Sequence, residues 1–513
     1  MELRGAGSRT EGHVVMSNHG LRAKWLGLDT HSEMMVLLHK NCPVSRSEGF
    51  TSHNRILLRA GDRHVIATLY QVESDLLDCN EAGLSDVAWR ALGVHEGDSV
   101  HASHAPLVDS LSLVRSRIFG HSLDERAFHL IIPDIVAGRY SAIETTSFIT
   151  ACAAKPLAQD EICFLTRAMV DAGQRMRWDH PVVADKHSVG GLPGNRTTPI
   201  IVAICASLGV VMPKTSSRAI TSPAGTADTM ETLAPVHLDE ATLRRVIERE
   251  GGCVAWGGAM RLSPADDILI RIEHALDIDS QGQMIASVLS KKIAAGATHL
   301  VIDVPVGPTA KVRSSEDAAL LSAGLTDVAR QFGLQSRIVP GDGNQPVGRG
   351  IGPALEARDV LAVLAGKADA PQNLRSRALI LAGAVLELAG KAGEGQGVSA
   401  ATGALEDGRA WAKFQRICEA QGGMRVPPEA AYRQQIHARK DGILSFIDNR
   451  RLARLAKLAG APSAKAAGVD LHVSLGQMLS AGMPLCTLHA DAEGELAYAL
   501  AYADANPGIF GIT

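Results

Sequence analysis

Alternating apolar and polar positions predict β-strands in the first part of the chain. Between residues 21 and 104, short runs of branched apolar residues, such as 55–60 and 64–70, are separated by turn residues such as Gly61-Asp62. We therefore predict a small β-barrel domain over residues 21–104. The polar residues 1–20 before it are expected to form a disordered leader.

The spacing of apolar residues changes at about residue 105 to every third or fourth position. The segments 124–135, 141–152 and 158–170 each carry this spacing, which is typical of amphipathic helices. Ser141 with Glu144 forms a capping box at the start of the second segment. A helical lobe is therefore predicted over residues 105–174.

Strand-like and helical segments alternate over residues 175–430. For example, the apolar run 299–306 is followed by a helical pattern over 315–332. Such alternation predicts an α/β domain with a mainly parallel sheet. The remaining residues, 431–513, mix strand and helix, so the expected fold class is multidomain α/β.

Composition excludes several classes of protein. The net charge of −4 and the 4% of aromatic residues give no sign of a nucleic-acid-binding surface. Eight cysteines without a CxxC pair argue against a disulfide framework and a zinc site. No apolar run approaches the ~18 residues of a membrane helix, and the N-terminus lacks the apolar core of a signal peptide. We expect a cytoplasmic protein that binds neither nucleic acid, membrane nor metal.

Two loops rich in small and hydroxyl residues indicate a phosphate site. The first, 185–198, places Lys186 and Ser188 beside glycines that let backbone N–H groups approach an anion, and an apolar run follows that can start a helix. The second, 216–231, repeats this chemistry. A glycine-rich turn between a strand and a helix is the alternative for either loop alone. Together they suggest two walls of one phosphate pocket at the carboxyl ends of a sheet.

Four motifs, in this order along the chain, resemble those of the thymidine and pyrimidine-nucleoside phosphorylases: Lys186–Gly191, Ser216–Glu231, Ala286–Lys292 and Gly343–Gly348. The chain is most similar to the branch with an extra N-terminal domain, which holds type 2 thymidine phosphorylases and AMP phosphorylases. The resemblance implies that the helical lobe is the family's small α domain and that residues 431–513 form its C-terminal α+β domain. It also implies a homodimer or larger homo-oligomer, with the N-terminal domain associated with assembly.

The resemblance further implies phosphorolysis, in which phosphate attacks C1′ of a nucleoside without a metal or organic cofactor. Ser287 and Lys291 lie one helical turn apart and would approach the base. The acidic stretch around Asp279 is otherwise typical of a solvated surface. The resemblance and the residue chemistry together give as candidates, for catalysis, Lys186, His187 and Asp279; for phosphate, Lys186, Ser188, Gly194, Ser216, Arg218 and Thr226; and for the nucleoside or nucleotide, Thr221, Ser222, Gly225, Thr229, Arg271, Ser287, Lys291 and Lys311.

The second loop departs from ordinary thymidine phosphorylases. A lysine after the aspartate is replaced by Thr229, and Thr221 and Ser222 are gained, which suits a second phosphate on the substrate. The expected reaction is thymidine plus phosphate to thymine and 2-deoxy-α-D-ribose 1-phosphate. AMP phosphorolysis to free base and ribose 1,5-bisphosphate is the alternative. Two further alternatives remain. One is a phosphoribosyltransferase that uses Asp266-Asp267 for Mg²⁺, and the other is a non-catalytic nucleotide-binding protein.

Overall fold

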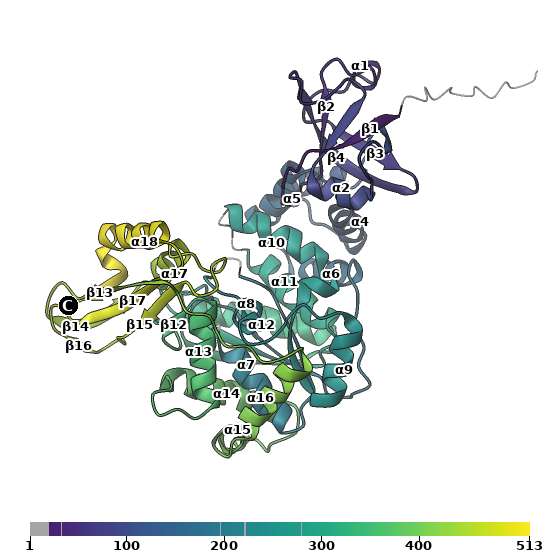
Figure 1. The fold of residues 1–513 in the computed structure, drawn as a ribbon. Coiled ribbons are helices and arrows are strands. Elements are labelled where there is room, and N and C mark those ends of the chain that lie inside the picture. Colours follow the sequence, from purple (N-terminus) through teal and green to yellow (C-terminus); the bar gives the residue numbers. More distant parts are fainter. Residues whose placement is uncertain (1–19, 32, 195, 220–221, 277, 279) are drawn as a thin grey trace, which may run out of the picture. The chain divides into compact units, whose positions relative to one another are not determined.

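The computed structural model describes residues 20–31, 33–194, 196–219, 222–276, 278 and 280–513. The predicted leader, 1–20, thus lies outside the described residues except for Gly20. By its internal contacts the chain divides into two compact units. The first comprises the residues up to Leu111 together with Ala137–Thr145, and the second comprises Ser112–Val136 and Thr146–Thr513. Figure 1 labels the elements of both.

The first unit contains a closed β-barrel, as the alternating pattern predicts. Its strands pair in the order β1-β5-β2-β4-β3-β6 and close on themselves (Figure 1). Alternate side chains such as Val36 and Leu38 are fully buried in its core. The elements are β1 (Leu21–Trp25), β2 (Met35–His39), α1 (Pro43–Ser47), β3 (Arg55–Ala60), β4 (Arg63–Val72), β5 (Glu81–Leu84), α2 (Asp86–Leu92) and β6 (Ser99–His104).

Helices dominate the next segment: α3 (Leu111–Ile118), α4 (Glu125–Val136), α5 (Ala142–Ala154) and α6 (Gln159–Asp171). Two later helices, α10 (Pro264–Leu276) and α11 (Gln281–Ala294), pack against α4 and α6. Helices of the predicted helical lobe therefore contact residues of the predicted α/β domain. Periodicity identifies a helix but does not say which neighbour it packs against.

Parallel strands form the centre of the second unit. Strands β7 (Ala184–Ser188), β10 (His299–Val306) and β11 (Gln335–Asp342) form a sheet in the order β11-β10-β7. Strands β8 (Met212–Ser216) and β9 (Gly252–Trp256) form a second parallel pair, and a parallel bridge links Val183 beside β7 to Val211 beside β8. Because both β7 and β8 end where the two predicted anion loops begin, the loops start at the same edge.

Helix α7 (Thr197–Ser207) follows the first loop, and every residue from Thr197 to Ala206 is buried. It packs against α14 and α16, so the first loop is fixed to the main hydrophobic core. The other elements here are α8 (Thr226–Glu231), α9 (Glu240–Glu250), a short 3₁₀ turn η1 (Gly257–Met260), α12 (Ser315–Gln331), α13 (Pro353–Leu364), α14 (Gln372–Leu388), α15 (Gly397–Glu406) and α16 (Arg409–Ala420).

The C-terminal segment is of α+β type and has antiparallel sheets. One has the order β12-β15-β17-β13, and its edge strand β12 comes from residues before 431. The other has the order β16-β14-β18. The elements are β12 (Gly350–Ile351), β13 (Tyr432–His437), β14 (Gly442–Ile447), α17 (Asn449–Leu458), β15 (Gly468–Leu471), β16 (Met478–Leu479), β17 (Pro484–Ala490), α18 (Glu493–Ala505), η2 (Pro507–Ile509) and β18 (Phe510–Ile512).

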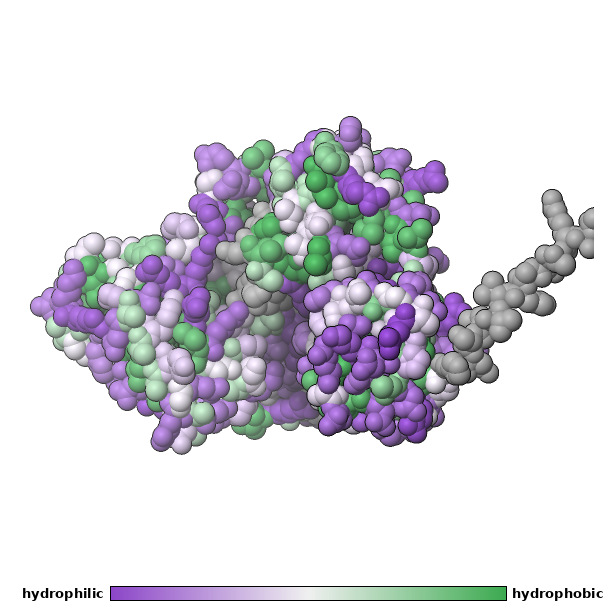
Figure 2. Space-filling model, turned by 90° about the horizontal axis from the view of Figure 1, so that it is seen from above, coloured by the Kyte–Doolittle hydropathy of each residue, from purple (hydrophilic) through white to green (hydrophobic). Residues whose placement is uncertain are grey.

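The surface drawn in Figure 2 mixes hydrophilic residues with scattered hydrophobic ones. Single exposed apolar side chains of this kind are normal on a folded protein. Within the described part of the chain, no helix combines the length and the apolar character that a membrane crossing requires.

Candidate active site

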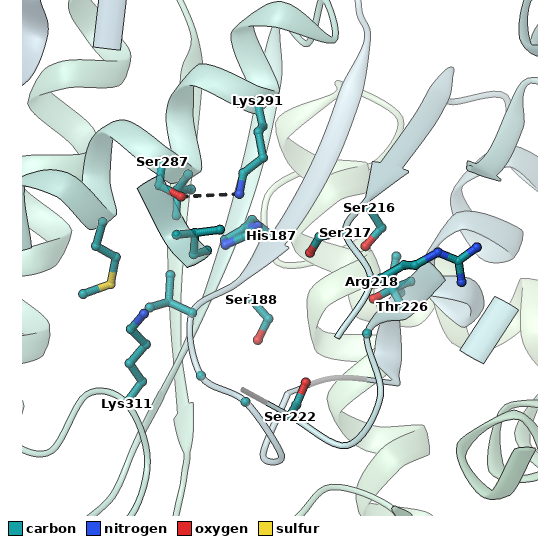
Figure 3. Close-up of a pocket in the computed structure, with 18 of the residues that line it drawn as sticks. His187, Ser188, Ser216, Ser217, Arg218, Ser222, Thr226, Ser287, Lys291 and Lys311 are labelled. Atoms are coloured by element: carbon teal, nitrogen blue, oxygen red, sulfur yellow. Dashed lines mark hydrogen bonds between the residues drawn. The ribbon is translucent and has the colours of Figure 1, made fainter. Parts of the chain in front are cut away.

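A pocket opens in the second unit where the two anion loops face helices α10 and α11. Figure 3 shows Ser287 and Lys291 on one side, Ser216, Ser217, Arg218 and Thr226 on another, and His187 between them. The lining residues include eleven of the sixteen predicted: Lys186, His187, Ser188, Ser216, Arg218, Ser222, Gly225, Thr226, Ser287, Lys291 and Lys311.

The first loop presents Lys186 and Ser188 from the end of β7. Lys186 is 1% exposed, and its Nζ donates to Thr197 Oγ1 at 2.9 Å and lies 3.8 Å from an oxygen of Asp303. Burial lowers the pKa of Lys186 to about 8, so at pH 7 the side chain is mostly a cation. Ser188 Oγ donates to Asp303 Oδ2 at 3.0 Å. A carboxylate on β10, itself bound by Arg377, thus orients both groups.

His187 is partly accessible at the centre of the pocket. Its pKa lies well below the ordinary value because of burial, with further lowering by Lys292, Lys291, Lys214 and Lys186. The imidazole is therefore neutral at physiological pH. A neutral ring can donate one hydrogen bond and accept one.

The second loop is braced by acidic side chains. Arg218 donates to both carboxylate oxygens of Glu231 at 2.7 Å and to Asp228 at 3.1 Å. Asp228 also accepts from the backbone N–H groups of Ala219 and Gly225 at 2.6 and 3.1 Å. The hydrogen bonds from Arg218, followed by one from Lys465, lower the pKa of Glu231 to about 2, so the brace stays charged.

Gly225 has no room for a side chain, because a Cβ there would lie 2.6–2.7 Å from backbone atoms of residues 217–219. The loop therefore folds tightly on itself, with the hydroxyls of Ser216, Ser217 and Thr226 lining the pocket. The Ser222 hydroxyl donates to the carbonyl of Ala224 at 2.7 Å.

Helices α10 and α11 and the residues between them supply a wall with polar and apolar side chains. Lys291 Nζ donates to Asp266 at 2.7 Å and to Ser287 Oγ at 3.4 Å. The apolar side chains of this wall are Ile270, Ile278, Met284 and Val288. Apolar surface with a few polar groups suits a flat heterocycle that has hydrogen-bonding edges.

Three predicted residues lie outside the lining. A Cβ at Gly194 would sit 2.1 Å from Ser188 Oγ, so Gly194 makes space for the serine. Thr229 is buried and donates to Glu356 at 3.2 Å. Arg271 is exposed and its Nε donates to the backbone of Asp267 at 2.9 Å. The predicted Thr221 and Asp279 lie outside the described residues.

Among the charged groups of the site that were not predicted from the sequence, two stand close to the anion loops. Lys214 lines the pocket from β8, and Asp303 holds the first loop from β10. For Asp303 the available signal was an aspartate inside the otherwise apolar strand β10, because buried charges are rare unless they are paired.

Comparison with known proteins gives two family matches. Residues 111–173 match the model described as "Glycosyl transferase family, helical bundle domain", and residues 180–411 match "Glycosyl transferase family, a/b domain". The chain is 58% identical over 491 residues to a "Putative thymidine phosphorylase" of Sphingopyxis alaskensis, covering 96% of this chain and 95% of that protein. A protein of the same name from Tolumonas auensis is 60% identical over 489 residues, with 95% and 97% covered.

Among solved structures, the chain is similar to anthranilate phosphoribosyltransferase from Thermus thermophilus. The TM-score is 0.50 and the identity 22%, over 60% of this chain and 98% of that one. At this identity the likeness concerns the fold alone.

Proposed function

Because the chain belongs to the thymidine phosphorylase family of nucleoside phosphorylases, we propose that it converts thymidine and phosphate to thymine and 2-deoxy-α-D-ribose 1-phosphate. The observation that carries the proposal is the meeting of two walls in one pocket. Lys186, Ser188, Ser216 and Thr226 offer a cation and hydroxyls to an anion, and α11 offers an apolar and polar surface to a base.

In the proposed reaction, a phosphate oxygen bonds to C1′ while the C1′–N1 bond breaks and its electron pair stays on the base. Lys186 and the loop hydroxyls hold the phosphate in line with C1′, which supplies most of the catalysis through positioning. Lys291 and Ser287 donate to the oxygens of thymine, where negative charge develops as the bond breaks. The neutral His187 hydrogen-bonds the sugar or phosphate from the centre, and the departing base takes its proton from a pocket donor or water.

AMP phosphorolysis is the second candidate, supported by Ser222 and Lys311. Both line the pocket, and Figure 3 draws both away from Lys291. If Lys291 contacts the base, the 5′ end of the substrate would lie near Ser222 and Lys311. The Ser222 hydroxyl, however, donates to Ala224 and would have to leave that carbonyl to bind a phosphate. Thymidine is therefore the preferred substrate.

The phosphoribosyltransferase alternative has less support. A Mg²⁺-bound pyrophosphate needs free carboxylate oxygens, whereas Asp266 is buried and accepts a 2.7 Å hydrogen bond from Lys291. The similarity to the Thermus enzyme concerns fold and not substrate.

The test is base release from thymidine, uridine, AMP and CMP, each with and without phosphate and with EDTA present. We expect thymine release that requires phosphate and is unaffected by EDTA. Release only from the monophosphates would replace thymidine by nucleotides as substrates, and no release from any of the four would overturn the proposal.

A further inference from the structure

A buried carboxylate beneath the pocket holds two lysines from two other elements. Asp185 on β7 is 2% exposed, and its oxygens lie 3.1 Å from Lys214 Nζ and 2.9 Å from Lys292 Nζ. Lys214 on β8 and Lys292 on α11 are each 3% exposed. Lys214 reaches the pocket lining, whereas Lys292 supports it from behind through Asp185.

The charges around the first loop do not balance, even when only the buried lysines are counted. Among the described residues of this cluster, the carboxylates are Asp185 and Asp303, and the cationic side chains facing them are Lys186, Lys214, Lys292 and Arg377. An excess of buried positive charge is unfavourable unless an anion offsets it or a lysine gives up its proton. A divalent oxyanion in the pocket would supply the missing negative charge.

We propose that Lys292 is a positioning residue that takes up a proton from solvent when a divalent oxyanion enters the pocket, which makes anion affinity depend on pH. The inference rests on the proposed function, because it takes phosphate as the occupant of this pocket. The proton converts the Lys292 amine to an ammonium group, which pairs with Asp185 beside Lys214. Asp185 also accepts from the backbone N–H of Lys186 at 2.6 Å, so the change reaches the anion-binding loop directly.

The surroundings of Lys292 support this assignment. Burial lowers its pKa to about 7, with Lys214 acting in the same direction and Asp185 opposing it. The groups around the two lysines are Lys186 and His187 on β7, Cys253 on β9, Asp303 on β10, Lys291 on α11 and its partner Asp266 on α10. Helices α6 and α12 also carry charged groups. Asp160 and Arg167 on α6 and Asp327 on α12 act on the pKa of the Cys163 thiol.

The direction of the pH effect follows. An anion raises the pKa of Lys292, so at pH 6 the side chain is protonated with or without the anion. At pH 8 the empty pocket holds mostly the neutral amine, and binding takes up a proton. Affinity for the anion therefore falls as pH rises above 7, by up to about tenfold per pH unit for one linked proton.

Sulfate is the probe, because it stays divalent from pH 6 to 9 and any proton taken up must come to the protein. Titration calorimetry of the full-length protein in buffers of different ionisation enthalpy counts these protons. We expect uptake at pH 8 and little at pH 6. Lys292→Met should lose Lys292's share of the uptake at pH 8 and weaken sulfate binding at pH 6. Lys292→Arg should still bind sulfate, because the arginine keeps a permanent positive charge. It should lose the same share of the proton uptake, because that charge does not titrate.

The matched control is Lys457→Met, which removes another lysine whose pKa burial lowers, on α17 outside the pocket lining. It should keep the wild-type uptake. The inference is overturned if wild-type protein binds sulfate without proton uptake at pH 8, if it binds no sulfate at all, or if Lys292→Met and Lys292→Arg retain the wild-type uptake. Proton-linked sulfate binding without base release from any nucleoside would overturn the proposed function and leave this inference standing.

Discussion

Lys186→Met removes the one buried cation that the first loop presents to the pocket. The lysine Nζ carries three N–H groups, of which one binds Thr197 and one points towards Asp303. The third is available to phosphate without breaking either contact. Methionine has a similar length and fills the same buried volume, and Asp303 keeps its contacts with Arg377 and Ser188. The variant should therefore fold.

The expected loss of phosphate binding comes from the missing charge of Lys186. Truncating one partner of a buried, hydrogen-bonded charge pair costs about 2–5 kcal/mol. Since each 1.4 kcal/mol is a factor of ten, kcat/KM for phosphate should fall by roughly 30- to 4,000-fold. Binding of thymine alone should change little, because in the proposed binding mode the base contacts α11 and not Lys186.

The assay is steady-state thymine release with phosphate varied at saturating thymidine, together with the dissociation constant of thymine and the thermal midpoint of each protein. Lys457→Met is again the matched control and should behave as wild type. A fall of less than about tenfold in kcat/KM for phosphate, with an unchanged thermal midpoint, would refute the phosphate-binding role of Lys186.

Three further changes test other parts of the structure. Gly225→Ala should raise the KM for phosphate because the new Cβ collides with the loop backbone, while Gly403→Ala, with nothing within 4 Å, should not; equal KM values would contradict the loop geometry. Arg117→Met leaves the buried Glu161 without its 2.9 Å partner and should lower the free energy of unfolding by about 3–5 kcal/mol in urea titrations; a loss below about 1 kcal/mol would be inconsistent with a buried pair. The pKa of His187 is lowered on folding, so the unfolded state binds more protons and stability should fall as pH drops below about 6.5; His187→Gln should flatten this dependence, and an unchanged slope would argue against a neutral His187.

Local features of this protein were readable in its sequence. Alternation and turn residues predict the barrel strands, and the two small-residue loops lead to the residues that line the pocket, because backbone approach to an anion demands glycine at particular places. Ser287 and Lys291 come from the family resemblance, and helical spacing places them on one face. These features depend on neighbours within a few residues.

Long-range pairing was not readable. Asp303 reaches Ser188 because β10 pairs with β7 in the register that sets these two residues side by side, and they are 115 positions apart. Lys214 and Lys292 meet at Asp185 for the same reason. Such contacts depend on sheet register and on the packing of α11, neither of which a periodic pattern encodes.

The Lys465 contact gives the C-terminal segment a role in the integrity of the second anion loop. Lys465 Nζ lies 3.1 Å from Glu231 and 3.4 Å from Asp228, and β15, which follows it, provides the partner of β12. A protein truncated at residue 430 would lose both the clamp on this acid pair and the partner of an edge strand. The C-terminal segment is therefore not a detachable module, and a shortened protein made for structural or industrial use should not be cut there.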